Sequence, residues 1–269
     1  MHEDGNRRGV TQRIRHGGRG WELRETSRAS AGYAPHVHDT FSLGQILGGR
    51  SRCLIGGRTR RIAAGACVWV RAGEVHACNP RPGAPWSYRM LHIDLAWLCA
   101  QGVSEPHSGV SASRALWLDY EALARRVFED APRAETEAAM LRLVRRLAPE
   151  WDRTDKPGRA EPDDPAALRR VREYIEAHAC ETLALDELAV LAGTTPWRLL
   201  RDFQRHHGIT PHALQLCLRA NRARRWLREG MTPCDAALAA GFADQSHLTR
   251  MFKRYVALTP GAYRRALTR

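Results

Sequence analysis

Two short helices joined by a tight turn are predicted for residues 232–265, and this pattern constrains the fold more than any other feature of the chain. The first helix is rich in alanine, which lets a second helix cross it closely, and Gly241 then supplies the backbone freedom that a sharp turn needs. Asp244 can cap the second helix. Apolar residues recur in that helix at helical spacing and are expected to face a core: Leu248, Met251, Phe252 and Tyr255. The segment therefore has the pattern of a helix-turn-helix unit.

The opposite face of this second helix is polar and cationic. Hydroxyl, amide and cationic side chains on one helical face suit the base edges and phosphates of a DNA major groove. Arg250 is expected to hold a guanine with both arms of its guanidinium, whereas Lys253 and Arg254 lie later in the helix and are expected to neutralise phosphates. The candidate DNA-binding residues of this unit are Gln245, Ser246, Thr249, Arg250, Lys253 and Arg254.

The same unit occurs a second time upstream, so the chain contains an internal repeat, in which Arg201 corresponds to Arg250. Thr195 can cap the corresponding helix. The outward residues of that helix are further candidate DNA contacts: Trp197, Arg198, Arg201 and Arg205. Alternatively, Trp197 only packs against its neighbours, and Arg201 and Arg250 hold only phosphates or pair with an acidic neighbour such as Asp202. Between the copies, residues 214–230 contain good helix formers without internal Gly or Pro and predict one spacer helix.

The sequence GFADQSHLTRMFKRYVALTPGAYRR, with both copies of the unit and the helix between them, resembles the signature of the AraC/XylS family of bacterial transcription regulators. The resemblance covers roughly the last 100 residues. It implies that Trp197, Arg201 and Arg250 meet bases, and that activation, with RNA polymerase as a partner, is the commoner role. One position departs from the family pattern. Ala257 stands where a glycine usually precedes the Thr-Pro pair, as Gly208 does in the first copy, and we expect strain in that turn.

Short alternating runs broken by glycine predict a small β-barrel over residues 21–110. The predicted strands lie within residues 42–49, 51–62, 65–73 and 87–95. His36 and His38, and later the glycine-led run that ends at His76, resemble the two motifs of the cupin fold, although the glutamate of the first motif is absent. This resemblance implies a domain that senses an effector.

Histidine and aromatic side chains are the candidate lining of an effector pocket in this barrel: His36, His38, Trp69, His76, Tyr88 and His92. Positions i and i+2 of a strand share one face, so His36 and His38, with His76 from a neighbouring strand, could also form a metal site. The missing carboxylate argues against a metal, and we expect no metal and no other cofactor. Alternatively, the histidines hydrogen-bond an organic ligand or cap loops, and the aromatic residues belong to an ordinary core.

Residues 111–151 are expected to form helices that break near Pro132. Two apolar stripes are visible there: Leu116, Tyr120, Leu123 and Val127, then Met140, Leu143, Val144 and Leu147. Stripes of this kind can pack on the barrel, but they look wider than one barrel needs, and the resembled family commonly dimerises in helices after the barrel. We therefore expect a homodimer. A polar linker is predicted at residues 152–166, the DNA-binding domain at residues 167–269, and disorder at residues 1–20.

The composition agrees with a polyanionic partner. The net charge is +13, and residues 167–269 hold 17 Lys and Arg against 9 Asp and Glu, so the basic excess is concentrated in the part that carries the repeat. A codon bias toward arginine is the alternative explanation. The seven cysteines form no CxxC pair and are expected to be small buried apolar residues in a reducing cytoplasm. Neither a membrane span nor an apolar signal core is visible, so we expect a cytoplasmic protein without membrane contact.

These features together predict an α+β protein with an N-terminal cupin-like β-barrel, following helices and a C-terminal all-α double helix-turn-helix domain. The function that they favour is a ligand-responsive regulator of transcription that binds double-stranded DNA and is not an enzyme. The alternative is a metal-binding cupin enzyme, or a metal sensor, fused to a DNA-binding domain. An alkyl-accepting DNA-repair protein is disfavoured, because no cysteine stands in a Pro-Cys-His-Arg context.

Overall fold

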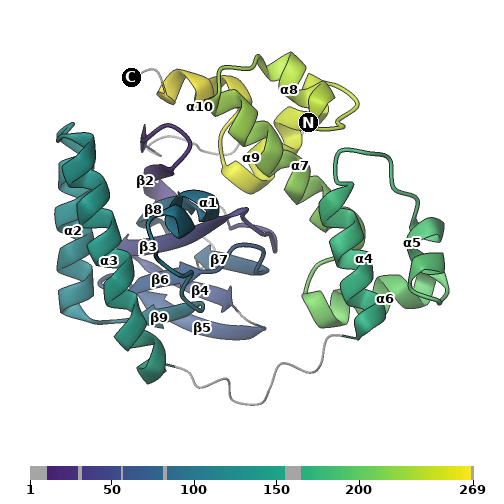
Figure 1. Ribbon diagram of the computed structural model, residues 1–269, viewed down its shortest axis with the longest axis horizontal. Helices are drawn as coiled ribbons and strands as arrows, with labels where there is room; N and C mark the ends of the chain where they lie inside the picture. The colour runs from purple at the N-terminus through teal and green to yellow at the C-terminus, as the bar shows by residue number, and fades with distance from the viewer. Residues whose placement is uncertain (1–10, 30–31, 56, 81–83, 155–164, 268–269) are drawn as a thin grey trace.

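The computed structural model describes residues 11–29, 32–55, 57–80, 84–154 and 165–267 (Figure 1). The strands are β1 Thr11–His16, β2 Trp21–Ala29, β3 Thr40–Gly48, β4 Arg50–Ile55, β5 Arg58–Ala63, β6 Cys67–Val70, β7 His76–Pro80, β8 Trp86–Asp94 and β9 Gly109–Ser111. The helices are α1 Leu95–Ala100, α2 Arg114–Phe128, α3 Arg133–Thr154, α4 Ala166–Ala177, α5 Leu185–Leu191, α6 Pro196–His207, α7 Pro211–Arg228, α8 Pro233–Ala239, α9 Gln245–Val256 and α10 Pro260–Leu267. Across these ranges, no helix has both the length and the apolar character needed to cross a membrane.

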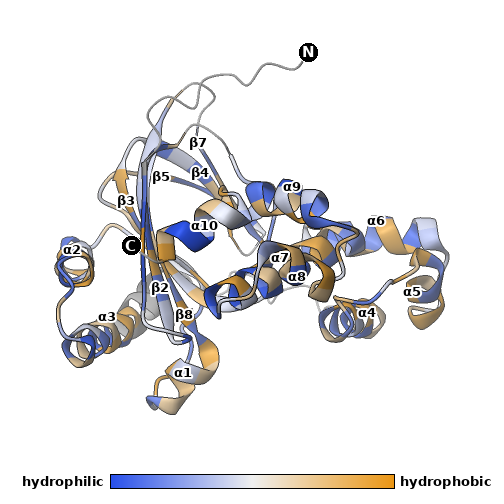
Figure 2. Ribbon diagram, turned by 90° about the horizontal axis from the view of Figure 1, so that it is seen from above, coloured by the Kyte–Doolittle hydropathy of each residue, from blue (hydrophilic) through white to orange (hydrophobic). Residues whose placement is uncertain are grey.

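The N-terminal part consists of two antiparallel sheets, with strand orders β1-β2-β8-β3-β6-β9 and β5-β4-β7. Side chains alternate between the two faces of a strand, so neighbouring positions enter different cores. Leu43 of β3 packs beneath α2 and α3, whereas Ile46 packs between the two sheets. The six-stranded sheet lies between α2 and α3 on one side and helices of the C-terminal domain on the other (Figure 2). The α+β class and the order of a β part followed by helices are confirmed.

The expectation that residues 1–20 are disordered is wrong for the described part of that segment. Strand β1 pairs with β2 along its whole length, and Ile14 lies opposite Arg24. The Ile14 side chain is buried in the core of the C-terminal domain, which explains why this edge strand is ordered. Residues 1–10 lie outside the described residues.

The helices after the sheets break where Pro132 predicted, because α2 ends at Phe128 and α3 begins at Arg133. Both apolar stripes pack against the six-stranded sheet of the same chain, and every residue of the two stripes is buried. The two stripes are therefore no wider than this one chain needs, contrary to the expectation. The predicted linker at residues 152–166 begins too early, because α3 continues to Thr154; residues 155–164 lie outside the described residues.

The cysteines differ from the expectation in two ways. Cys53 of β4 and Cys78 of β7 lie directly opposite each other in neighbouring strands and are joined by a disulfide. Cys99 and Cys234 are exposed, so they are not small core residues. The sequence could not show this pairing, because it is set by the register of two strands whose cysteines are 25 residues apart in the chain.

The C-terminal domain contains both predicted helix-turn-helix units, α5–α6 and α8–α9, around one hydrophobic core. The spacer helix is also confirmed: α7 runs from Pro211 to Arg228 and starts three residues earlier than predicted. Gly241 makes the turn of the second unit with φ of +78°, and a Cβ at this position would lie 2.1 Å from the carbonyl oxygen of Cys180. No other residue fits that turn.

The C-terminal ends of α6 and α9, the second helices of the two helix-turn-helix units and called the reading helices below, offer a paired test of backbone strain. Gly208 ends α6 with φ of +70°, and Ala257 ends α9 with φ of +61°. The left-handed region costs an L-residue about 1–2 kcal/mol, and glycine avoids this strain. Glycine also has more conformational freedom in the unfolded chain, which offsets part of its advantage. We expect Ala257→Gly to raise the free energy of unfolding by about 1 kcal/mol and Gly208→Ala to lower it by about as much, measured by urea denaturation. Shifts of the same sign in both variants would contradict strain as the cause.

Candidate functional site

The outward faces of α6 and α9 are exposed to solvent. The side chain of Thr195 accepts a hydrogen bond from Arg198 N at the start of α6, and Asp244 accepts one from His247 N at 2.6 Å at the start of α9. Trp197 is 74% exposed, which is unusual for so large an apolar side chain. The predicted DNA-binding residues are all exposed except the half-buried Thr249: Trp197, Arg198, Arg201, Arg205, Gln245, Ser246, Thr249, Arg250, Lys253 and Arg254.

The two corresponding arginines differ in their surroundings. Arg198 Nε and Arg201 Nε each lie 3.4 Å from a carboxylate oxygen of Asp202. In the part of the chain that the structure describes, no acidic side chain pairs with Arg250. To contact a base, Arg201 must therefore break or share its ion pair with Asp202. Arg250 has no such ion pair to break among the described residues.

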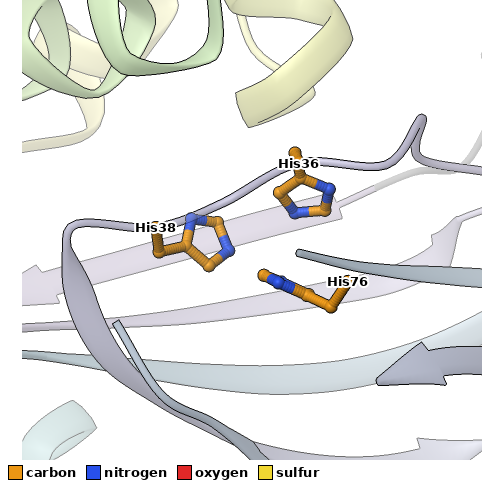
Figure 3. Close-up of side chains that lie close together, drawn as sticks. All are labelled: His36, His38 and His76. Atoms are coloured by element: carbon orange, nitrogen blue, oxygen red, sulfur yellow. The ribbon is translucent and has the colours of Figure 1, made fainter. Parts of the chain in front are cut away.

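Three predicted site histidines, His36, His38 and His76, lie together in the N-terminal part (Figure 3). His36 and His76 form an isolated β-bridge, in which each backbone N–H donates to the carbonyl of the other residue at 3.0 and 2.9 Å. The three ring centroids are 4.3 to 4.9 Å apart, and each of the three histidines is at most 8% exposed. The structure thus brings the two sequence motifs into one buried cluster.

Hydrogen bonds to the backbone fix two of these rings. His36 Nδ1 donates to Ala34 O at 2.8 Å, and His76 Nδ1 donates to Glu74 O at 3.0 Å. A carbonyl oxygen only accepts, so Nδ1 carries the proton and Nε2 keeps its lone pair. Burial lowers the pKa of His36 to about 3 and the pKa of His76 to about 4, and it holds the pKa of His38 well below its ordinary value. The cluster is therefore neutral at pH 7.

Two more of the predicted pocket residues lie next to this cluster. The ring centroid of His92 is 4.7 Å from that of His38, and His92 Nδ1 lies 2.9 Å from Ser42 Oγ. The hydroxyl of Tyr88 shares a hydrogen bond of 2.5 Å with the hydroxyl of Tyr33, whose ring faces that of His36 at 5.7 Å.

Trp69 does not belong with these residues. It lies opposite Leu43 in the register of β3 and β6, so it faces α2 and α3, away from His92. Its indole N–H donates to His107 O at 2.5 Å, and the ring is fully buried. Placing Trp69 in the pocket was wrong, because strand alternation shows which residues share a face but not which face the helices cover.

The C-terminal domain docks on the segment that carries His36 and His38. Between these histidines, Val37 donates its N–H to Cys217 Sγ at 3.3 Å, and its carbonyl oxygen accepts a hydrogen bond from Asn221 Nδ2 at 2.9 Å. The Val37 side chain is 1% exposed and packs in the core of the C-terminal domain. Figure 3 shows helices of that domain directly above the histidines.

A second contact between the two parts buries charged groups. The Tyr263 hydroxyl of α10 donates a hydrogen bond to the Glu22 carboxylate of β2, and Arg228 Nη1 lies 3.8 Å from the same oxygen. Arg24 Nη2 donates to a backbone carbonyl at the end of α9 at 2.5 Å. Burial alone would raise the pKa of Glu22, but Arg224 and Arg24 hold it below its ordinary value. The carboxylate therefore stays ionised inside the interface.

Sequence reasoning missed both contacts between the two parts. A signal was present in the spacer helix α7, where Asn221 and Arg224 follow Cys217 at helical spacing. A helix that only separates two units would present such polar side chains to solvent. In the structure both residues are 4% exposed, because the N-terminal part covers this face. In β2, the polar residues Glu22 and Arg24 alternate with apolar residues, and they are buried as well. What neither pattern showed was the surface that covers these side chains.

Comparisons with known proteins cover both parts of the chain. The AraC-like ligand binding domain family matches residues 20–161, and the helix-turn-helix domain family matches residues 188–266. The sequence is 29% identical over 223 residues to the HTH-type transcriptional regulator YbfI of Bacillus subtilis, which covers 79% of this chain and 80% of that protein. It is 35% identical over 108 residues to the right origin-binding protein of Escherichia coli, which covers 39% of this chain and 36% of that protein.

Solved structures of ToxT from Vibrio cholerae share the fold. One matches with a TM-score of 0.57 at 11% identity and covers 97% of this chain and 99% of ToxT. Another, with an unsaturated fatty acid bound, matches with a TM-score of 0.57 at 12% identity over 100% of this chain and 98% of ToxT. At these identities the likeness shows the fold alone.

Proposed function

Because the chain belongs to the AraC family of transcription regulators, we propose that it contacts promoter DNA through α6 and α9 and responds to an effector held beside the histidine cluster. The observation that carries this proposal is the contact at Val37. The helix that spaces the two reading helices also holds the backbone between two histidines of the candidate effector site. An effector that shifts this segment changes how the reading helices are held, provided that it binds the two arrangements unequally.

The effector pocket in this proposal consists of the cluster and its neighbours: His36, His38, His76, Tyr88 and His92. The fatty acid bound to ToxT in one matching structure supports a ligand-holding role for a protein of this fold.

We further propose that the protein works in the cytoplasm as an activator that contacts RNA polymerase and that it catalyses no reaction. The test is selection of random double-stranded DNA with the purified chain. An enriched motif with two half-elements about one helical turn apart is expected, and enrichment of no motif contradicts the proposal.

Arg250 is proposed to read a base, and Lys253 serves as its contrast. We expect Arg250→Ala to cost about 1–3 kcal/mol of specific binding and to relax the choice of base at one position of the selected motif. Lys253→Ala should weaken specific and random DNA alike and reduce the salt slope of binding by about one unit, because it removes a phosphate contact. Binding of both variants to a library of single-base changes distinguishes these effects. A uniform loss for Arg250→Ala, with discrimination unchanged, would show that this arginine reads no base.

We propose that the chain forms a homodimer through the outer faces of α2 and α3. The inner faces are covered by the sheet, but Leu118 on the outer face of α2 is 46% exposed, which supports this surface. Leu118→Glu is expected to shift the full-length chain from dimer to monomer in sedimentation equilibrium, because a carboxylate in an apolar contact is costly to bury. Val190→Glu, at an 81% exposed site on α5, is the matched control and should leave the dimer intact. A native chain that sediments as a monomer at micromolar concentration would exclude the dimer.

A further inference from the structure

We propose that His36, His38 and His76 hold one divalent transition-metal ion, such as Zn²⁺, and that this ion is an effector of the regulator. The inference rests on the proposed function and deepens it by naming the class of ligand. Within the described residues, these three histidines form the group of His, Cys and acidic side chains whose candidate ligand atoms all lie within 4.8 Å of one another. The rings come from two separate segments and lie close together in space (Figure 3).

Two of the three donors are oriented before any ion binds. The Nδ1–H groups of His36 and His76 are held by backbone carbonyls, and the two residues are also tied by their β-bridge. Hydrogen bonds of this kind fix the tautomer and the ring orientation of metal-binding histidines. In a tetrahedral site with Zn–N bonds of about 2.0–2.1 Å, the ligand nitrogens lie about 3.4 Å apart, so modest turns of the rings close the site.

His38 supplies the third donor. Its Nδ1 is buried and has no hydrogen-bond partner among the described residues, which is a costly state for a polar atom. The ring lies 4.9 Å, between centroids, from both His36 and His76. Figure 3 shows the other ring nitrogen of His38 turned toward His36 and His76, so this ring can complete the set of three donors.

The chemistry of the donors selects the kind of ion. Neutral imidazoles suit Zn²⁺, Co²⁺ and Ni²⁺, whereas Mg²⁺ and Ca²⁺ require oxygen ligands. Three histidines with an open fourth position are a known zinc ligand set, so the absent glutamate of the first motif does not exclude a metal. Nearby charges are mixed: Arg224 and Arg24 oppose a cation, while Glu22 and Asp39 offset them.

The position of the site gives the ion a direct route to the DNA-binding domain. Val37 stands between two of the ligands, and its N–H and carbonyl groups are bound by Cys217 and Asn221 of α7. An ion held by both His36 and His38 restrains the backbone at Val37, which lies between them. The strength of the α7 contact then depends on whether the ion is present, and by linkage DNA changes the affinity for the ion by the same factor.

The first test counts metal in the full-length chain, prepared without a histidine tag and stripped with a chelator. Titration with Zn²⁺ and with Co²⁺ should load one equivalent per chain, with the intense visible absorption of tetrahedral Co²⁺. His76→Ala should bind at least about 10-fold more weakly. His178→Ala, which removes a partly exposed histidine paired with Glu181, should bind like the native chain. Less than one equivalent in the native chain, or equal binding by both variants, overturns the proposal. If His76→Ala does not fold, the stoichiometry and Co²⁺ spectrum of the native chain decide.

The second test measures affinity for the selected DNA motif with Zn²⁺ and with chelator. We expect the two affinities of the native chain to differ by about 5-fold or more. In Asn221→Ala the metal should still bind but the difference should shrink. Equal affinities in the native chain overturn the effector role. Specific DNA binding without metal uptake overturns the metal site and leaves the proposed function standing, whereas metal uptake without any selected motif contradicts the proposed function and leaves the site standing.

Discussion

In the metal-free protein, the free energy of unfolding should fall steeply as the pH drops from about 6.5 toward 4. The folded pKa values of His36 and His76 are about 3 and about 4, and those of His38 and His92 are also lowered, in each case chiefly by burial. The unfolded chain therefore binds more protons throughout this range, and stability is lost as the pH falls below the unfolded value. Each histidine contributes about 1.4 kcal/mol per pH unit until its folded pKa is reached.

Urea denaturation at pH 7, 6.5, 6, 5.5 and 5 measures this effect before most carboxylates titrate. His76→Gln should reduce the pH slope by about one proton, because glutamine does not titrate. His178→Ala, at a partly exposed site, should leave the slope unchanged. A native slope that equals the slope of His76→Gln would contradict the prediction. The other charged groups that face the cluster are Arg24, Arg224, Arg228, Glu22 and Asp39.

Replacing Glu22 with alanine should cost the docked arrangement about 3–5 kcal/mol, because it leaves buried arginines without their counter-charge. Glu22 is fully buried, accepts the hydrogen bond of Tyr263 and lies near Arg24, Arg224 and Arg228. Separation of the two parts returns the arginines to water and removes this cost. We therefore expect the two parts to separate in the variant. Hydrogen exchange at the backbone amide of Val37 reports this separation and should become faster in the variant.

A matched control for Glu22→Ala is available in the same interface. Arg19 Nε and Glu229 Oε1 also bridge the two parts, at 3.1 Å, but the arginine side chain is 79% exposed. Exposed pairs contribute about 0–1 kcal/mol, so Glu229→Ala should leave the exchange rate at Val37 nearly unchanged. Equal effects of the two variants would show that burial of the charge at Glu22 is unimportant.

The C-terminal domain could be predicted in detail because its signals are local. The caps at Thr195 and Asp244, the turn at Gly241 and the apolar spacing of Leu248 and Phe252 lie within a few residues of the structure they specify. Each signal acts through the backbone of its own helix, so no knowledge of distant partners was needed. The exposed reading faces followed from the same periodicity.

The contacts between the two parts could not be predicted in this way. Glu22 and Arg24 look like the solvent face of a strand, and only the arrangement of α7, α9 and α10 makes that face an interior. The pairing of Cys53 with Cys78 depends in the same way on a strand register that no local pattern encodes. His36, His38 and His76 were recognised through motif spacing, but their closeness to Cys217 and Asn221 was not.

The joint at Val37 determines which pieces of this protein can be exchanged with a relative. On the side of the N-terminal part, the hydrogen bonds of this contact use the backbone N–H and C=O groups of Val37, which any residue except proline would present, and the Val37 side chain adds apolar packing. On the α7 side it uses the side chains of Cys217 and Asn221, which are specific to their positions. A hybrid that receives a foreign DNA-binding domain at residues 155–164 therefore keeps a working joint only when the incoming helix carries equivalent groups. The sequence suggests a simple cut in the linker, but an exchanged DNA-binding domain must also match the N-terminal part at α7 and at the contacts of α9 and α10 with Arg24 and Glu22.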